Sequence, residues 1–500
     1  MTTAFASVSP TLGNRPRIKP PWPLAAPASP IDPLSLRHEL RDFDRLPIAT
    51  VLKESRPHVY EQCDRVMRRA REFAETHVTP NATAWDEEAA DRHDFVPWAA
   101  IDAGLPYGFL GMNVPGVLGG GNLGVVAACV FAEEIAAADA GVYVVYGAHA
   151  LALSLVIASL DLPIMARLGR EIVEGEANGK AVLLALAHTE PTGGSDVEDV
   201  DDIQRADLRS RFRRVQGGVR LDARKVFISN GSIARYHVVT AFEDVRRPLE
   251  TMAAFLVPGD AAGLSIGRVE RKLGQRSSAA VEVLCDHVFV PDAYVIGFDD
   301  GGRAIDTTLS LTRGPVGAMA TGIIRGTLER TLAYLAQKRV RGRWLFEEQW
   351  VQLALADMLA ALQAARGLYM DAGMAGDAWG IARLMALFPA HVPARIREHA
   401  AYDAIVGLPI VTDRLRSLYR SQVANEQLQR LVSHASIAKF ACSDAAVRVS
   451  MQAMEILAED ANDPQWGIEK AMRDAKLAQI FEGTNQINRL HVARGLIRRA

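Results

Sequence analysis

Near its C-terminus the chain reads Ile480-Phe481-Glu482-Gly483-Thr484-Asn485-Gln486, with a glycine directly after a carboxylate. Glycine adopts left-handed backbone conformations that other residues avoid, so Gly483 permits a tight turn at this point. Such a turn lets the Glu482 side chain project from a bend between two helical stretches into a cavity. We therefore predict that Glu482 acts as a catalytic base.

The composition narrows the class of protein. The 500 residues are 49% hydrophobic and 23% charged, which is typical of a large globular protein with two or three domains. A formal net charge of -3 provides no basic surface for nucleic acid or for an anionic membrane. We therefore predict no nucleic-acid partner.

Cysteine usage and hydropathy indicate the compartment. The four cysteines are far apart and form no CxxC pair, so neither a metal site nor a disulfide framework is predicted. The chain start lacks a basic region followed by an apolar run, and no run of roughly 18 apolar residues occurs anywhere. These features predict a cytoplasmic protein without a membrane span.

Three kinds of sequence pattern follow one another along the chain. Residues 1–35 contain eight prolines and predict a disordered tail, because proline denies a segment both helical and ladder hydrogen bonds. Residues 36–180 read as an all-α domain, with helical stretches at Val66–His77 and Val125–Ala138. Short β-branched and aromatic runs then predict a central β domain, a barrel or sandwich, over residues 181–297. The clearest of these runs are Val226–Ser229, Tyr236–Phe242, Ala253–Val257 and Val281–Val290.

Residues 298–500 return to a helical period and predict a domain that resembles a four-helix bundle. We expect two apolar stripes to form the core of this bundle. The first stripe is Val351, Leu355, Met358, Leu362 and Tyr369, and the second is Ile437, Phe440, Val447, Met451 and Met454. Between them, residues of about 376–428 are rich in proline and arginine and read as an insertion. The predicted fold class is therefore an α+β multidomain protein.

A second motif lies where the helical texture gives way to strands. It reads Ala187-His188-Thr189-Glu190-Pro191-Thr192-Gly193-Gly194-Ser195-Asp196. Its glycines and serine offer backbone N–H groups and a hydroxyl to a phosphate or to the polar edge of a flavin, although a Gly-Gly-Ser segment alone is more often a simple turn. Further segments follow at Lys225–Gly231, Arg271–Ser278 and Val288–Pro291.

The order and spacing of these segments resemble those of the acyl-CoA dehydrogenases, from about Val66 to Ile497 outside the insertion. The resemblance implies that an FAD lies between the three domains. It also implies a homodimer or homotetramer in which the C-terminal bundle of one subunit helps to hold its neighbour's cofactor. The alternation of helical and strand textures agrees independently with this architecture.

The same resemblance assigns roles to individual residues. Residues that match cofactor-binding positions are Leu186, Thr189, Gly194, Ser195, Phe227, Ile228, Ser229, Lys338, Arg339, Gln349, Thr484 and Gln486. Residues that match substrate positions are Ser195, Arg313, Glu482 and Gly483. Some family members carry the base just before an arginine on an early helix of the last domain, but this chain has Thr312 there. That threonine favours Glu482 as the base.

The implied reaction is FAD-dependent α,β-dehydrogenation of an acyl thioester, from acyl-CoA to trans-2-enoyl-CoA. Glu482 would take the α-proton while the β-hydride passes to flavin N5. The thioester carrier is coenzyme A or an acyl carrier protein, and an electron-transferring flavoprotein is the expected acceptor. Two alternatives stay open, namely a flavin oxidase or monooxygenase on the same fold, and a family member that serves only in binding or assembly.

Two departures from the family pattern concern the cofactor. Lys338 stands where the family has an arginine that faces the FAD pyrophosphate, and Arg341 replaces a phenylalanine. A lysine cannot reproduce the bidentate geometry of an arginine. Ala458-Glu459-Asp460-Ala461 stands where the family has a glycine pair, and two acids near a phosphate would repel it. Three outcomes stay open, namely that the loop moves away, that the extra arginines compensate, or that cofactor binding is weaker than usual. If the site fails, we expect this acidic loop to be the cause.

Overall fold

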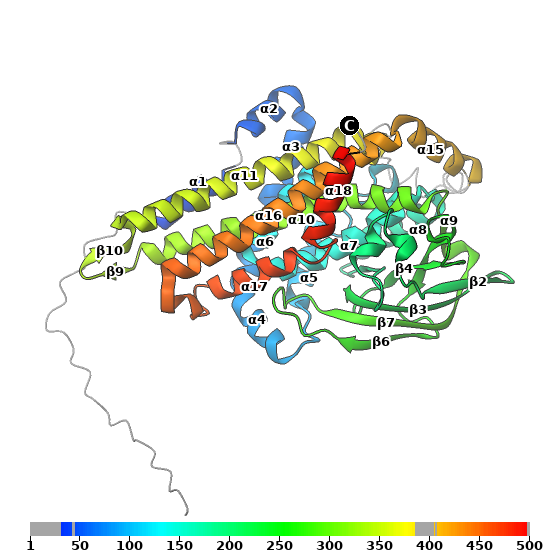
Figure 1. The fold of residues 1–500 in the computed structure, drawn as a ribbon, viewed down its shortest axis with the longest axis horizontal. Coiled ribbons are helices and arrows are strands. Elements are labelled where there is room, and N and C mark those ends of the chain that lie inside the picture. The colour runs from blue at the N-terminus through cyan, green and yellow to red at the C-terminus, as the bar shows by residue number, and fades with distance from the viewer. Residues whose placement is uncertain (1–31, 43–45, 386–404, 406–407, 498–500) are drawn as a thin grey trace, which may run out of the picture.

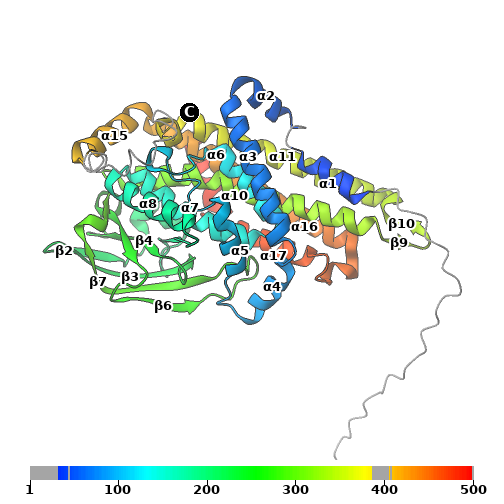
Figure 2. The ribbon, with the colours of Figure 1, turned by 180° about the vertical axis from the view of Figure 1, so that it is seen from behind.

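The computed structural model describes residues 32–42, 46–385, 405 and 408–497. A β-sheet lies at one end of the molecule, and three long helices, α10, α11 and α16, extend from it toward the opposite end (Figure 1). The N-terminal helices α1, α2 and α3 lie across the back of these long helices (Figure 2). Most of the predicted proline-rich tail falls outside the described residues. The predicted order of a helical domain, a β domain and a helical bundle is confirmed.

The first domain consists of helices that precede the sheet. They are α1 (Pro33–Arg41), α2 (Pro47–Ser55), α3 (Pro57–Phe73), α4 (Ala82–Asp91), α5 (Trp98–Gly104), α6 (Val125–Ala138), α7 (Ala140–Ser159) and α8 (Leu162–Ala177), and a π-helical turn at Ala74–Val78 extends α3. Asp139 caps α7, because its carboxylate accepts a hydrogen bond from the Val142 backbone at 2.8 Å. Helix α7 is long and apolar enough to cross a membrane, but 78% of its most apolar window is buried inside the protein. It is therefore a core helix at the centre of the molecule.

The second domain is an eight-stranded mixed sheet. Its strands are β1 (Leu184–Ala187), β2 (Arg211–Val215), β3 (Gly218–Ser229), β4 (Tyr236–Phe242), β5 (Met252–Pro258), β6 (Leu264–Val269), β7 (Ala280–Pro291) and β8 (Val295–Gly297). The order across the sheet is β6-β7-β3-β2-β4-β5-β8, and β1 pairs with β4 in parallel. A register shift between Lys225 and Ile228 interrupts the pairing of β3 with β7 and leaves a bulge at Phe227.

The third domain is built on α10 (Gly301–Leu335), α11 (Gln349–Trp379) and α16 (Asn425–Leu457), followed by α17 (Ile468–Ala478) and α18 (Asn485–Ile497). A short hairpin, β9 (Arg339–Val340) and β10 (Arg343–Trp344), joins α10 to α11. The predicted stripe on α11 lies largely in the core, with four of its five residues buried and Leu355 half-buried.

The predicted core stripe on α16 is wrong. Met451 is 52% exposed, and the other four residues of that stripe are only half-buried. The buried face consists instead mainly of small residues such as Ala438, Cys442 and Ala446. Helices α10 and α16 approach so closely that a Cβ added to Gly317 would lie 2.8 Å from the Ala438 carbonyl oxygen. Small side chains therefore occupy this contact, whereas hydropathy alone favours the larger residues.

The described part of the predicted insertion forms α12 (Ile381–Met385) and α15 (Pro409–Gln422). The remainder of the predicted range overlaps the end of α11 and the start of α16, or lies outside the described residues. Helix α15 is fixed to the rest of the protein by Arg416, which donates to the Ser159 carbonyl at 2.9 Å and forms an ion pair with Asp299 at 3.2 Å. Tyr419 and Thr307 of α10 share a hydrogen bond of 2.9 Å.

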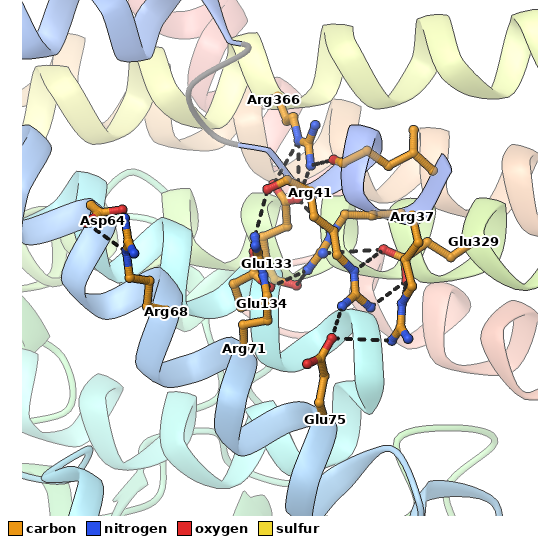
Figure 3. A network of polar contacts seen from close by, with 12 residues as sticks. Arg37, Arg41, Asp64, Arg68, Arg71, Glu75, Glu133, Glu134, Glu329 and Arg366 are labelled. Carbon is orange, nitrogen blue, oxygen red and sulfur yellow. Dashed lines mark hydrogen bonds and ion pairs between the residues drawn. The ribbon is translucent and has the colours of Figure 1, made fainter. Parts of the chain in front are cut away.

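Buried ion pairs attach α1 to the long helices (Figure 3). Arg37 and Arg41 both donate to Glu329 of α10, at 3.1 Å and 2.8 Å. Two further arginines satisfy carbonyls at the end of α1, since Arg366 donates to the Leu40 oxygen and Arg71 to the Arg41 oxygen, each at 2.7 Å. The last carbonyls of a helix have no partner within that helix, so these arginines complete its C-terminus.

Candidate functional site

A cavity of about 480 Å³ lies between the sheet, α7 and the first half of α10. Apolar side chains form most of its wall, among them Leu151, Leu155 and Leu309. Six of the residues assigned from the sequence line it, namely Leu186, Thr189, Phe227, Ile228, Ser229 and Glu482. Side chains from the two motifs, almost 300 positions apart in the chain, therefore meet around one space.

Glu482 lies in the bend between α17 and α18, where the sequence places it. Both Glu482 and Gly483 have left-handed backbone conformations, with φ of 56° and 76°. Buried donors hold the backbone carbonyls of this turn. Lys439 donates to the Gly483 oxygen at 2.7 Å, and Arg313 donates through Nε to the Glu482 oxygen at 3.2 Å. The strained turn is thus held by donors on α16 and α10.

The Glu482 carboxyl has an unusual environment. Burial, and next the nearby Glu198 carboxylate, raise its pKa to about 7, against the opposing effects of Arg313, a hydrogen bond from Thr312 and Lys439. The Thr312 hydroxyl lies 3.4 Å from Glu482 Oε2. Thr312, which occupies the alternative position for a base, therefore contacts the Glu482 carboxylate. A carboxyl with a pKa near neutrality can exchange a proton at physiological pH.

Arg313 does not line the cavity but lies fully buried behind the Glu482 turn. Besides the Glu482 carbonyl, its guanidinium donates through Nη1 to Ser436 at 3.0 Å and to His491 Nδ1 at 2.6 Å. His491 Nε2 lies 2.8 Å from the Asp199 carboxylate. Because Nδ1 accepts from Arg313, the ring proton resides on Nε2 and points to Asp199. Burial lowers the pKa of His491 and favours this neutral form.

The two sequence motifs are joined by a direct contact. The Thr484 backbone N–H donates to Ser195 Oγ at 3.0 Å, so the glycine-rich turn and the turn that carries Glu482 are fixed to each other. Gly194 has open space on its side-chain face, because in the described part of the chain no atom beyond its two neighbours lies within 4 Å of an added Cβ. The glycine-rich turn is also fixed to strand β3, because Lys225 of β3 and Glu190 of the turn form an ion pair of 3.0 Å with both side chains 1% exposed. Lys225 also donates to the His188 carbonyl at 2.9 Å.

The residues around the cavity suit a flat, polar-edged ring system. At the β3 bulge, Phe227 has φ of 60° and its side chain is 62% exposed, which is rare for a large aromatic residue in a strand. The hydroxyl-bearing residues Thr189 and Ser229 line the same space. An outward-facing aromatic ring beside hydroxyl groups fits the expected flavin.

Other predicted cofactor residues lie elsewhere. Lys338, Arg339 and Gln349 are at the β9–β10 hairpin and the start of α11, at the end of the bundle opposite the sheet (Figure 1). The guanidinium of Arg339 stacks on Trp344 at 4.1 Å from the ring centroid. Within one chain, these three residues therefore lie far from the cavity. Gln486, another predicted cofactor residue, is exposed on α18.

The acidic loop has a partner that the sequence did not indicate. Asp460 accepts from Lys338 at 2.5 Å and from the Tyr334 hydroxyl at 2.8 Å. The hydrogen bond from Lys338 lowers the pKa of Asp460. Lys338 and the acidic loop are the two departures from the family pattern, and the charges of Lys338 and Asp460 therefore neutralise each other. Ala458 keeps a positive φ of 50°, a conformation that suits a glycine better than an alanine.

Sequence reasoning missed Glu198, Lys439 and His491. Each is a single polar residue on a different element, without a local pattern, and only the fold brings them to the Glu482 turn. In the described part of the chain, one group of three potential metal ligands exists, Asp222, Asp286 and His287. It is largely exposed, lies outside the cavity, and indicates no metal centre by itself.

Comparison with known protein families gives three adjoining matches. The chain matches the models for the acyl-CoA dehydrogenase N-terminal domain over residues 61–160, the middle domain over 185–288, and the C-terminal domain over 299–387 and 410–497. The unmatched gap of 388–409 falls within the predicted insertion. Together these matches cover most of the chain.

Individual relatives agree with the family matches. Cyclohex-1-ene-1-carbonyl-CoA dehydrogenase of Geobacter metallireducens is 28% identical over 449 residues, which span 88% of this chain and 99% of the relative. An acyl-CoA dehydrogenase of Bacillus subtilis is 27% identical over 446 residues, which span 88% of this chain and 99% of that relative. The fold is similar to that of butyryl-CoA dehydrogenase from Megasphaera elsdenii, with a TM-score of 0.67 and 24% sequence identity. The superposition covers 87% of this chain and 98% of the butyryl-CoA dehydrogenase chain.

Proposed function

Because this chain belongs to the acyl-CoA dehydrogenase family, whose members are FAD-dependent oxidoreductases acting on CH–CH bonds, we propose that Glu482 is its catalytic base. Glu482 would remove the α-proton of an acyl-CoA thioester, and the product would be the trans-2-enoyl-CoA. The observation that supports this proposal most strongly is the position of the Glu482 carboxyl, which lines an apolar cavity on a turn held from behind by buried cations.

The chemistry requires a base of suitable strength at a weakly acidic carbon. Burial raises the pKa of Glu482 to about 7, so the carboxyl is both substantially ionised and strongly basic at neutral pH. We assign polarisation of the thioester carbonyl to the Glu482 backbone N–H, which the left-handed turn takes out of the helical hydrogen-bond pattern. Arg313 and Lys439 stabilise the turn and leave the carboxyl free toward the cavity.

We assign flavin binding in this chain to Thr189, Ser195, Phe227 and Ser229, which lie at or beside the cavity. FAD supplies the hydride acceptor for the β-hydrogen. The apolar wall excludes water from the reacting carbons and provides the space for a hydrocarbon acyl group. A carrier-protein thioester is the other form of substrate that the proposal includes.

The separation of Lys338, Arg339 and Gln349 from the cavity supports a homo-oligomer, dimer or tetramer, in which these residues reach the cofactor of a neighbouring subunit. An electron-transferring flavoprotein is the proposed electron acceptor. Four free cysteines, all buried, are compatible with the proposed cytoplasmic location.

The test is an anaerobic titration of the FAD-loaded protein with a panel of acyl-CoA thioesters that differ in chain length and branching. We expect at least one thioester to bleach the flavin absorbance and to yield the trans-2-enoyl product. If no thioester bleaches the flavin and another substrate is turned over with consumption of oxygen, the protein is an oxidase or monooxygenase instead. Failure to retain FAD at all would indicate a binding or assembly role.

A further inference from the structure

Glu198 is a second carboxyl at the cavity that contains Glu482. It is the last residue of a short 3₁₀ turn, Ser195–Glu198, which begins at the serine that contacts Thr484. Its side chain is 18% exposed, and it lines the same cavity as Glu482. The proposed function gives this residue no role.

One guanidinium connects Glu198 to the Glu482 turn. Arg313 Nη2 lies 3.7 Å from Glu198 Oε2, whereas Arg313 Nε donates to the Glu482 carbonyl. Among the described residues, neither that Nη2 nor that Oε2 has a hydrogen-bond partner. Arg313 Nη2 and Glu198 Oε2 therefore face each other as an ion pair.

Gly483 marks the point where these groups meet. A Cβ added at Gly483 would lie 2.9 Å from Arg313 Nη2 and 3.0 Å from Glu198 Oε2. The Glu198 carboxyl is thus packed against the residue that follows Glu482. Such close packing of a second acid beside the first is costly unless the charges are balanced.

We propose that Glu198 is a positioning residue for Glu482, which shares Arg313 with the Glu482 turn and competes with Glu482 for a single proton. This inference rests on the proposed function only for its kinetic consequence. While Glu198 is ionised, its negative charge opposes ionisation of Glu482 and so makes Glu482 the stronger base. Arg313 holds both segments in place at the same time.

The charges around the two carboxyls support this competition. The groups that act on the Glu482 carboxyl are Glu198 of the 3₁₀ turn, Tyr143 of α7, Thr312 and Arg313 of α10, and Lys439 of α16. Three more groups act on Arg313 and not on Glu482 directly, namely Asp199, Asp306 of α10 and His491 of α18. His491 is neutral, and burial lowers the pKa of Lys439 to about 7. Among these groups Arg313 is then the one permanent cation, beside the carboxyls of Glu198, Glu482 and Asp306, which burial drives toward the neutral state.

The test compares the Glu198→Gln holoenzyme with the parent. Glutamine keeps the size of the side chain and removes its charge. Infrared difference spectra across a pH series report the carboxylic C=O band, and the Glu482→Gln variant identifies the part of that band that belongs to Glu482. We expect the Glu482 midpoint to fall by about one pH unit or more in Glu198→Gln, because a like charge has been removed.

Kinetics provide a second readout. In Glu198→Gln, the acid limb of the flavin-reduction rate should move to lower pH by the same shift, and the plateau rate should fall because the base is weaker. Glu198→Asp retains the charge and should restore the parental midpoint. Asp202→Asn is the matched control, since Asp202 pairs with Arg494 at 3.0 Å and does not line the cavity. It should leave both readouts unchanged.

Two results would overturn the inference. One is an unchanged Glu482 midpoint in Glu198→Gln. The other is a change in KM that depends on the acyl group while the midpoint stays constant, because Glu198 would then contact substrate. The infrared titration needs no turnover, so this inference can fail while Glu482 remains the base, and it can hold even if the proposed reaction is wrong.

Discussion

Replacement of Gly483 by alanine should damage both stability and catalysis, because this glycine is constrained in two ways. Its φ of 76° costs a non-glycine residue about 1–2 kcal/mol. A new Cβ would also lie 2.8 Å from Ile487, 2.9 Å from Arg313 and 3.0 Å from Glu198. Overpacking of a dense interior costs about 1–3 kcal/mol, so Gly483→Ala should lose about 2–5 kcal/mol in total.

The matched control is Gly217→Ala. Gly217 has the same φ of 76°, but among the described residues no atom beyond its two chain neighbours lies within 4 Å of an added Cβ. It therefore carries the backbone cost without the crowding, and should lose only about 1–2 kcal/mol. Urea unfolding of both variants measures the free energy of unfolding, and the difference between them isolates the crowding at Gly483.

The same pair of variants should differ in rate. To admit the Cβ, Arg313 or the Glu482 backbone must move, and a displacement of about 1 Å at a reacting group costs about 100-fold. Stopped-flow flavin reduction should therefore be slow in Gly483→Ala and parental in Gly217→Ala. Equal losses of stability and equal rates of flavin reduction in the two variants would show that Arg313 and Glu198 do not constrain Gly483.

Three further outcomes are expected. The rate of flavin reduction should fall as the pH drops below about 7, because Glu482 then becomes protonated and can no longer accept a proton, and a flat profile from about pH 5 to pH 9 would contradict this. Lys225→Met should lower the free energy of unfolding by about 3–5 kcal/mol, since it leaves Glu190 buried without its cation. Adding Glu190→Gln should recover much of this loss in urea unfolding, and no recovery would show that the pair is not the cause. Ala458→Gly should raise the unfolding midpoint by relieving about 1 kcal/mol of strain, whereas Ala356→Gly on the exposed face of α11 should lower it by about as much. A loss of stability in both would contradict the strain at Ala458.

The sequence predicted those elements whose length and residue types suit one kind of secondary structure. The helix expected at Val125–Ala138 is α6, and the strand expected at Tyr236–Phe242 is β4, each with the same bounds. Both segments are buried along almost their whole length, so length and residue type distinguish them, because α6 is long and rich in alanine whereas β4 is short and rich in aromatic and β-branched residues. The order of the domains follows from the same patterns.

The buried face of α16 could not be predicted in this way. Helix α16 packs so closely on Gly317 of α10 that alanines and a cysteine fill the contact, and Met451 lies outside it. The distance between two helices is a tertiary property, and hydropathy within one helix does not report it.

The candidate site shows the same limit. A short turn such as the one around Glu482 has a local sequence signature. The groups that hold this turn and shift the pKa of Glu482 have none. Glu198, Lys439 and His491 come from separate elements and have no common spacing. Likewise, Lys338 and Asp460 are two separate irregularities in the sequence, yet in the structure they form one ion pair.

The most direct test of the account is the rate of anaerobic flavin reduction in Glu482→Gln, with an acyl-CoA that bleaches the parent protein. Glutamine preserves the shape of the side chain and cannot accept the α-proton. We expect FAD content and acyl-CoA binding to remain parental while the reduction rate falls by about 10²–10⁴-fold. Reduction at the parental rate would show that Glu482 is not the base.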